Sequence, residues 1–186
     1  NIDVVRFGTG ISPADIVLVR DGYDLTLEIS GTSDKLTLEN FGGGESYLIE
    51  RFEFSDGTIW LADQLRAQIV GIPVVGTEGN DYMAAWSEEN STIQAGGGSD
   101  TIIGFNGADN LRGGTGNDIV QGGTGDDIYL FDIGDGQDRI FEAGGDLDII
   151  RFGSGVNPND IEFLRGSSDV YLSISGSNDR ISIERW

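Results

Sequence analysis

The chain has 186 residues, of which 38% are hydrophobic, so it can build a folded core and is not disordered throughout. Thirty-two acidic residues against eleven basic ones give a formal charge of −21, which excludes nucleic acid as a natural partner and favours cations. Cysteine and histidine are absent and no apolar run has the length of a membrane span, which excludes disulfides and a membrane-crossing helix. An acidic surface that serves only solubility is the alternative interpretation of the charge.

Residues 1–70 are predicted to form a β-rich flanking module. Residues 24–29 and 35–39 alternate apolar and polar side chains, which is typical of half-buried antiparallel strands. Asp21 and Gly22 supply the tight turn of a hairpin just before the first of them. The sequence therefore predicts an antiparallel sheet near the start of the chain.

The remainder of this module is predicted to contain one more strand and a short helix. Residues 49–54 have the composition of a strand. Residues 60–69 place Leu61, Leu65 and Ile69 at helical spacing, so we expect them on one face of a helix. A break at residues 71–73 then ends the module.

Between Gly76 and Leu130, six consecutive blocks repeat every nine residues, most clearly residues 113–121 and 122–130. Each block reads G-G-x-G-x-D-x-U-x, where U is apolar, a pattern known for Ca²⁺-binding β-helices. Glycine permits positive φ, so the loop can turn sharply with its carbonyls directed at one spot, and the last three residues form a short strand. Residues 71–147 are therefore predicted to form a parallel β-roll in which two blocks complete one coil.

The roll is expected to have a thin core between two walls of strands. One wall should stack Met83, Ile102, Val120 and Ile140, and the other Ile93, Leu111, Tyr129 and Ile150. Parallel strands of two or three residues cannot offset the lost chain entropy alone, so the coils need a further tie. Ca²⁺ suits the loops because it accepts six to eight oxygen ligands, whereas zinc and copper lack their usual ligands and Mg²⁺ disfavours an all-protein cage.

In this pattern the chain resembles the RTX, or haemolysin-type calcium-binding, repeats of secreted Gram-negative toxins, proteases, lipases and adhesins. The resemblance implies an all-β fold, a calcium-binding parallel β-roll flanked by antiparallel β-rich capping modules with one short helix. It also implies that Ca²⁺ lies between one loop and the loop two blocks later. The first loop gives the carbonyls of its second and fourth positions and its aspartate, and the second loop gives the carbonyls of its first and third positions and its aspartate.

Carried over position by position, the resemblance implies about four calcium ions, within a range of three to five. One site would use Gly96, Gly98 and Asp100 with Gly113, Thr115 and Asp118. Its neighbour on the other edge would use Phe105, Gly107 and Asp109 with Gly122, Thr124 and Asp127. A third would use Thr77, Gly79 and Asp81 with Ala95, Gly97 and Asp100, with Ala85 as an insertion. The fourth pairs Gly114, Gly116 and Asp118 with Asp138, across a register shift at residues 131–132.

One block departs from the pattern. In residues 86–94, Ser91 stands in the aspartate position and Glu88 in a glycine position, so the site that this block would share with Asp109 is left open. Beyond Asp138, the sequence also resembles the end of RTX blocks.

The first module recurs at the other end of the chain. Residues 3–16 reappear as residues 148–161, and the match continues to Trp186. Residues 148–186 are therefore predicted to be a second, truncated flanking β-rich module, similar to the calcium-binding-related domain that often follows RTX repeats. We expect a larger parent protein in which rolls and modules alternate, and no intact signal peptide at Asn1.

Other functions are disfavoured by the residues themselves. A phosphate-binding loop needs a lysine, and the only one, Lys35, lies far from the repeated glycines. Residues 132–138 lack EF-hand ligand spacing. The neighbouring Glu88 and Glu89 are read as a solvated loop, so no catalytic residue is expected. Five aromatics could stack on sugars, but core or cap packing is favoured for them: Tyr47, Trp60, Tyr82, Trp86 and Trp186.

The predicted function is that of a calcium-binding structural module in a large secreted RTX protein. Repulsion among the loop aspartates would keep the chain unfolded in the low-calcium cytosol, and Ca²⁺ would fold it after type I secretion. The alternative is an extracellular adhesin or a carbohydrate-binding module of an RTX adhesin or polysaccharide-modifying enzyme. Calcium ions and the remainder of the parent protein are the expected partners, with no nucleic acid and no membrane-spanning segment.

Overall fold

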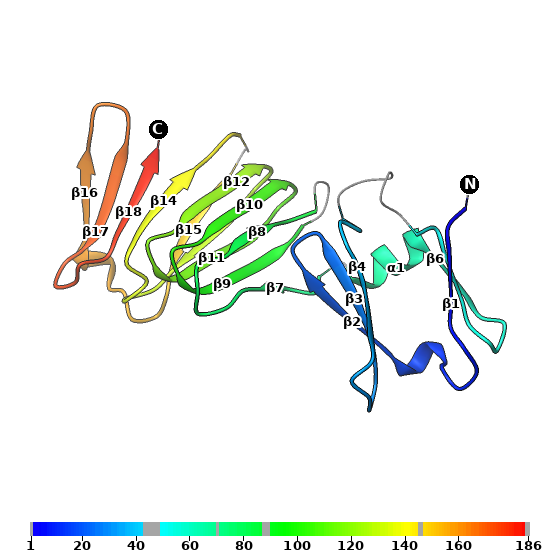
Figure 1. Cartoon of the computed structure of the whole chain (residues 1–186). Helices are drawn as coiled ribbons and strands as arrows, with labels where there is room; N and C mark the ends of the chain where they lie inside the picture. The colour runs from blue at the N-terminus through cyan, green and yellow to red at the C-terminus, as the bar shows by residue number, and fades with distance from the viewer. Residues whose placement is uncertain (1, 43–48, 70, 87–89, 145–146, 185–186) are drawn as a thin grey trace. The chain divides into compact units, whose positions relative to one another are not determined.

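The computed structural model describes residues 2–42, 49–69, 71–86, 90–144 and 147–184 (Figure 1). The chain divides into two compact units, Asn1–Ile72 and Pro73–Trp186. Nearly all regular structure is β, with one α-helix in the described ranges, which confirms the predicted fold class. No helix in these ranges is long and apolar enough to cross a membrane.

The first unit consists of two small sheets and a helix. Its elements are β1 (Val4–Arg6), the 3₁₀ turn η1 (Pro13–Asp15), β2 (Ile16–Asp21), β3 (Asp24–Ile29), β4 (Lys35–Leu38), β5 (Arg51–Glu53), β6 (Ile59–Leu61) and α1 (Ala62–Ile69). Strands β2, β3 and β4 form the antiparallel sheet that the alternating residues predict, with the expected tight turn after Asp21. In the other sheet, β1 runs parallel to β5, and β5 runs antiparallel to β6.

The predicted helix begins later than its apolar spacing suggests. Trp60 and Leu61 pair with β5 and belong to β6, so the helix starts at Ala62. The side chain of Leu61 is 49% exposed, whereas Leu65 and Ile69 are fully buried. The prediction that Leu61 shares one helical face with Leu65 and Ile69 is therefore wrong, because strand pairing overrides helical periodicity at this end.

The second unit is a two-walled parallel roll that ends in an antiparallel hairpin. Its strands are β7 (Val74–Val75), β8 (Tyr82–Ala84), β9 (Thr92–Gly98), β10 (Thr101–Asn106), β11 (Asn110–Gly116), β12 (Ile119–Thr124), β13 (Ile128–Phe131), β14 (Gln137–Phe141), β15 (Ile149–Phe152), β16 (Ile161–Arg165), β17 (Val170–Ile174) and β18 (Arg180–Glu184), with the 3₁₀ turn η3 (Pro158–Asp160) before β16. Successive roll strands alternate between a seven-stranded sheet, β16-β17-β18-β14-β12-β10-β8, and a five-stranded sheet, β15-β13-β11-β9-β7.

Both predicted rows of stacked side chains are confirmed by the strand register. Ile102 pairs with Met83 on one side and with Val120 on the other, and Val120 pairs with Ile140. The second wall stacks in the same way: Ile93, Leu111, Tyr129 and Ile150. Seven of these eight side chains are buried, and Ile150 is partly buried against them. The nine-residue period therefore fixes the core of the roll.

The duplicated sequence folds twice in the same way. Strands β15 to β18 repeat β1 to β4, and η3 repeats η1. In each copy the strand after the hairpin turn is tied to the 3₁₀ turn, since the amide of Ser30 donates to the Asp15 carbonyl and that of Ser175 to the Asp160 carbonyl, both at 2.8 Å. Residues 148–184 extend both walls of the roll, because β15 pairs with β13 and β18 with β14.

Candidate metal centres

The loops of the roll pack so closely that only glycine fits at the repeated positions. A β-carbon on Gly116 would lie 1.6 Å from the carbonyl oxygen of Gly98, and one on Gly125 would lie 1.9 Å from that of Gly107. Both glycines also have positive φ, +144° and +124°. The carbonyls of each loop therefore face the loop of the next coil, as a site shared between coils requires.

The block aspartates join successive coils through one carboxylate oxygen each. In the first ladder, the amides of Asp81, Asp100 and Asp118 donate to Oδ1 of Asp100 (2.8 Å), Asp118 (2.8 Å) and Asp138 (3.0 Å). In the second ladder, the amides of Ser91, Asp109 and Asp127 donate to Oδ1 of Asp109 (2.6 Å), Asp127 (2.9 Å) and Asp148 (3.0 Å). Each of these carboxylates thus accepts a hydrogen bond from the preceding coil through a single oxygen.

The other carboxylate oxygen is buried without a hydrogen-bond partner at three positions in the described part of the chain. Oδ2 of Asp100, Asp118 and Asp127 has none, and these residues are at most 1% exposed. Burying an uncompensated carboxylate is costly, and each of these groups needs a cation or a proton. A metal ion with oxygen ligands would supply the missing partner.

The electrostatics of the loops agree with this need. Burial, together with the charges of neighbouring Asp100 and Asp135, raises the pKa of Asp118 to about 6. Burial raises the pKa of Asp138 to about 8, with the charges of Asp118, Asp135 and Asp179 adding to the effect. The pKa values of Asp100 and Asp127 are raised for the same first reason.

Carbonyl and carboxylate oxygens converge on the same small spaces. A β-carbon on Gly104 would lie 2.4 Å from Oδ2 of Asp109 and 2.4 Å from the carbonyl oxygen of Gly122 in the next coil. At Gly76 the corresponding oxygens are those of Ala95, at 2.2 Å, and Asp81 Oδ2, at 2.9 Å. Oxygen donors without nitrogen or sulfur fit Ca²⁺ better than zinc or copper.

The loops assigned to the first two predicted sites lie on adjacent coils. In the first, Gly96, Gly97 and Gly98 pair with Gly114, Thr115 and Gly116, and Gly113 directly precedes these partners. In the second, Phe105 pairs with Gly123 and Asn106 pairs with Thr124. Gly107 directly follows the first of these segments, and Gly122 directly precedes the second. Phe105 takes a positive φ of +71°, as a glycine would in its place. The ligand sets themselves remain a prediction.

The third and fourth predicted sites also join adjacent loops. The amide of Gly97 donates to the carbonyl of Thr77 at 2.9 Å, and the carbonyl oxygen of Gly79 lies 2.7 Å from where a β-carbon on Gly98 would stand. Ala85 is buried after β8. Farther along, Gly116 forms a parallel β-bridge with Gly136. The two loops are therefore paired again before Asp138, despite the register shift at residues 131–132. In the degenerate block, the backbone of Ser91 joins the ladder, while Glu88 lies outside the described residues.

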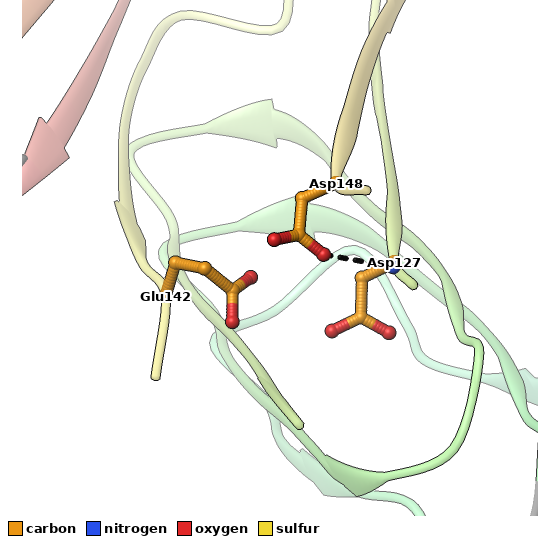
Figure 2. Close-up of side chains that lie close together, drawn as sticks. All are labelled: Asp127, Glu142 and Asp148. Carbon is orange, nitrogen blue, oxygen red and sulfur yellow. Dashed lines mark hydrogen bonds between the residues drawn. The ribbon is translucent and has the colours of Figure 1, made fainter. Parts of the chain in front are cut away.

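A further acidic group was missed from the sequence. Asp127, Glu142 and Asp148 each place a carboxylate oxygen within 4.8 Å of the others (Figure 2). Glu142 also accepts a hydrogen bond from the hydroxyl of Tyr129. Asp148 was assigned to the flanking module, but the motif Asp148-Ile149-Ile150 repeats the aspartate and apolar positions of a nonapeptide block. That local pattern was the available signal, whereas nothing in the repeat marks Glu142.

Most of the aromatics considered for sugar stacking are unsuited to it or are not described. Trp86 is 3% exposed, as core packing predicts. Trp60 packs edge-on against Phe54, with ring centroids 4.9 Å apart. Tyr82 is 69% exposed, and Tyr47 and Trp186 lie outside the described residues, as do Glu88 and Glu89.

The family model of the RTX calcium-binding nonapeptide repeat matches residues 75–104, 87–120 and 103–138, and that of the haemolysin-type calcium binding protein related domain matches residues 24–64. The sequence matches none of the curated proteins with which it was compared. Among solved structures, the chain is similar to the extracellular lipase LipA from Serratia marcescens, with 16% identity and a TM-score of 0.48, over 100% of this chain and 31% of the lipase chain. The chain therefore contains RTX calcium-binding nonapeptide repeats over residues 75–138 and a haemolysin-type calcium binding protein related domain over residues 24–64.

Proposed function

We propose that this chain is a structural module whose roll folds when it binds Ca²⁺ outside the cell. The observation that carries the proposal is the set of buried aspartate oxygens without hydrogen-bond partners in the described coils, Oδ2 of Asp100, Asp118 and Asp127. Asp100 and Asp118 hold equivalent positions in successive coils, and Asp127 holds the same position in the other ladder. Ca²⁺ would supply the positive charge that these oxygens lack and would tie one coil to the next.

The residues proposed to hold the ions are those of the four loop pairs described above. Asp148 and Glu142 extend the same scheme to the last coil, where they lie with Asp127 (Figure 2). About four ions are proposed for the four pairs. The role proposed for these residues is structural rather than catalytic.

Without calcium, two features would oppose folding of the roll. Its core is a single layer between two walls, and its carboxylates are buried close to one another. Mutual repulsion and desolvation of these groups would keep the coils open where calcium is scarce. An open chain suits type I secretion, and extracellular calcium matches sites with dissociation constants of about 10⁻⁴ to 10⁻³ M.

The hairpin after the roll would protect its last coil. Strands β18 and β15 pair with the final roll strands, and Ile181 and Ile183 join the core cluster of the roll. Covering the end of a solenoid removes an exposed edge and shields its apolar interior. We propose that this module caps the roll once calcium has ordered it.

Circular dichroism and calorimetry of the whole chain during calcium titration test the proposal. We expect little roll structure in chelator, a cooperative gain of β structure on adding Ca²⁺, and no equal gain with Mg²⁺ at the same concentration. A roll already complete in chelator, with no change in its thermal stability on adding calcium, would contradict calcium-driven folding. Titration calorimetry in the same buffer would count the ions.

A further inference from the structure

The two copies of the duplicated module differ in what lies beside them. In the second unit, β15 pairs with roll strand β13, and β18 pairs with roll strand β14. In the first unit, the equivalent strands β1 and β4 each have one neighbour, β5 and β3, and end their sheets on the other side, among the residues that the structure describes.

The side of β1 that faces away from β5 corresponds to the side through which β15 pairs with the roll. The amide of Phe7 donates to the carbonyl of Glu53 in β5, at 2.9 Å. Because amides alternate along a strand, those of Arg6 and Gly8 point to the opposite side. In the second copy, Gly153, which aligns with Gly8, donates from that side to the carbonyl of Phe131 at 3.0 Å.

The side of β4 that faces away from β3 likewise corresponds to the side through which β18 pairs with the roll. The carbonyl of Asp34 accepts the amide of Ile29 at 3.0 Å, as that of Asp179 accepts the amide of Ile174 at 3.2 Å. The next amide along the second copy, that of Arg180, donates to the roll at the carbonyl of Gly136, 2.8 Å away. Lys35 stands in the position of Arg180, so its amide points away from β3.

An aspartate beside this edge contacts the roll in the second copy, and its counterpart in the first copy does not share that environment. The carboxylate of Asp179 is 7% exposed and accepts the amides of Gly134 (2.9 Å) and Gly136 (3.1 Å) in the last loop of the roll. Its counterpart Asp34 is exposed.

The next apolar position along the strand is also buried in the second copy and exposed in the first. Ile181, at 1% exposed, packs into the core of the roll, whereas its counterpart Leu36 is 37% exposed. The edge thus has both an acceptor for loop amides and an apolar side chain left uncovered.

We propose that the free sides of β1 and β4 bind the last coil of a second nonapeptide β-roll, with the Asp34 carboxylate accepting two amides of its final loop. This inference rests on the proposed function, since that roll would itself be ordered by calcium. The contacts would be those of β15 and β18 with the roll in the second unit. Adding strands to an open sheet edge satisfies backbone groups that would otherwise invite non-specific pairing.

An extended chain tests the inference. Residues 73–147 are duplicated in front of Asp3, so that Leu147 of the added copy joins Asp3 as Leu147 joins Asp148 in the protein. Hydrogen exchange is measured in calcium, with and without the added roll. We expect the amides of Arg6 and Lys35 to exchange on the order of ten-fold or more slowly in the extended chain.

Two variants of the extended chain separate this interface from general stabilisation. Asp34→Asn should speed exchange in the final loop of the added roll, as Asp179→Asn should in the original one, whereas Glu28→Gln on the exposed part of β3 should change neither. Unchanged exchange at Arg6 and Lys35 beside a folded added roll would overturn the inference, and so would an added roll that stays unfolded while the original folds. If neither roll responds to calcium, the proposed function fails instead.

Discussion

The backbone amide of Asp100 donates a hydrogen bond to Oδ1 of Asp118, 2.8 Å away, while Oδ2 of Asp118 is buried with no hydrogen-bond partner in the described ranges. One carboxylate therefore serves two purposes. Its first oxygen sets the spacing of two coils, and its second oxygen makes the pair of coils dependent on an added positive charge. Since both ladders repeat this arrangement, the stability of the roll should depend on the solution around it more than that of an ordinary β protein.

Replacing Asp118 with Asn should have opposite effects with and without calcium. The amide oxygen of Asn can still accept the Asp100 amide, but the variant loses the negative charge that calcium would compensate. We expect calcium affinity of the roll to fall on the order of ten-fold or more, because affinity follows the number of charged ligands. In chelator, the variant should be more stable than the parent chain, because a buried charge has gone.

Calcium titration followed by circular dichroism measures the first effect, and the β-structure signal of variant and parent chain in chelator measures the second. Asp63→Asn, which changes an exposed aspartate in α1, is the matched control and should leave the roll unaffected. A variant that binds calcium as tightly as the parent chain would show that Asp118 is only a spacer between coils.

Gly116→Ala should destabilise the roll far more than Gly57→Ala destabilises the first unit. Both glycines have positive φ, so both substitutions carry a backbone cost of about 1–2 kcal/mol. Only at Gly116 would the new methyl group meet a carbonyl oxygen at 1.6 Å, whereas the space around Gly57 is open. We expect about 3 kcal/mol or more at Gly116, measured by denaturant unfolding in saturating calcium. Equal losses at the two positions would mean that φ alone, and not close approach of coils, selects glycine.

The sequence is most informative where the period is strict. Ile102 and Leu111 fall in the predicted rows because the nonapeptide leaves the strand no other register. Prediction fails where tertiary pairing competes with a local pattern, as at Leu61, which lies in a strand instead of on the buried face of the helix. It also fails for Glu142, because its proximity to Asp127 comes from how the last coil folds back and not from any spacing in the chain.

Acid should stabilise the calcium-free roll. The pKa of Asp138 is raised to about 8 and that of Asp118 to about 6, against 3.8 for an ordinary aspartate. A group whose pKa is raised in the folded state stabilises that state fully below its unfolded-state pKa. This stabilisation is lost as the pH rises through its folded-state pKa. In chelator, the free energy of unfolding of the roll should therefore be highest near pH 4 and should fall towards pH 8.

The first unit should respond to pH in the opposite direction. Hydrogen bonds lower the pKa values of Asp15, Glu50 and Asp56, so their contribution is present above pH 4 and is lost on acidification. Hydrogen exchange in chelator at pH 4.5 and pH 8, corrected for intrinsic rates, follows the two units separately. A roll that unfolds more readily at pH 4.5 than at pH 8 would contradict the proposed burial of charged carboxylates.

Glu142→Gln should shift the calcium dependence of the last coil. The glutamate lies with Asp127 and Asp148, so its charge would favour a cation there and oppose folding without one. We expect the calcium concentration at the folding midpoint to rise by about two- to ten-fold, with the change concentrated in hydrogen exchange of β13 and β15. Tyr129→Phe removes only the hydroxyl that donates to Glu142 and should shift the midpoint less, while Glu162→Gln on the exposed hairpin is the matched control. If Tyr129→Phe matched the effect of Glu142→Gln, Glu142 would act through its hydrogen bond to the tyrosine and not through its charge.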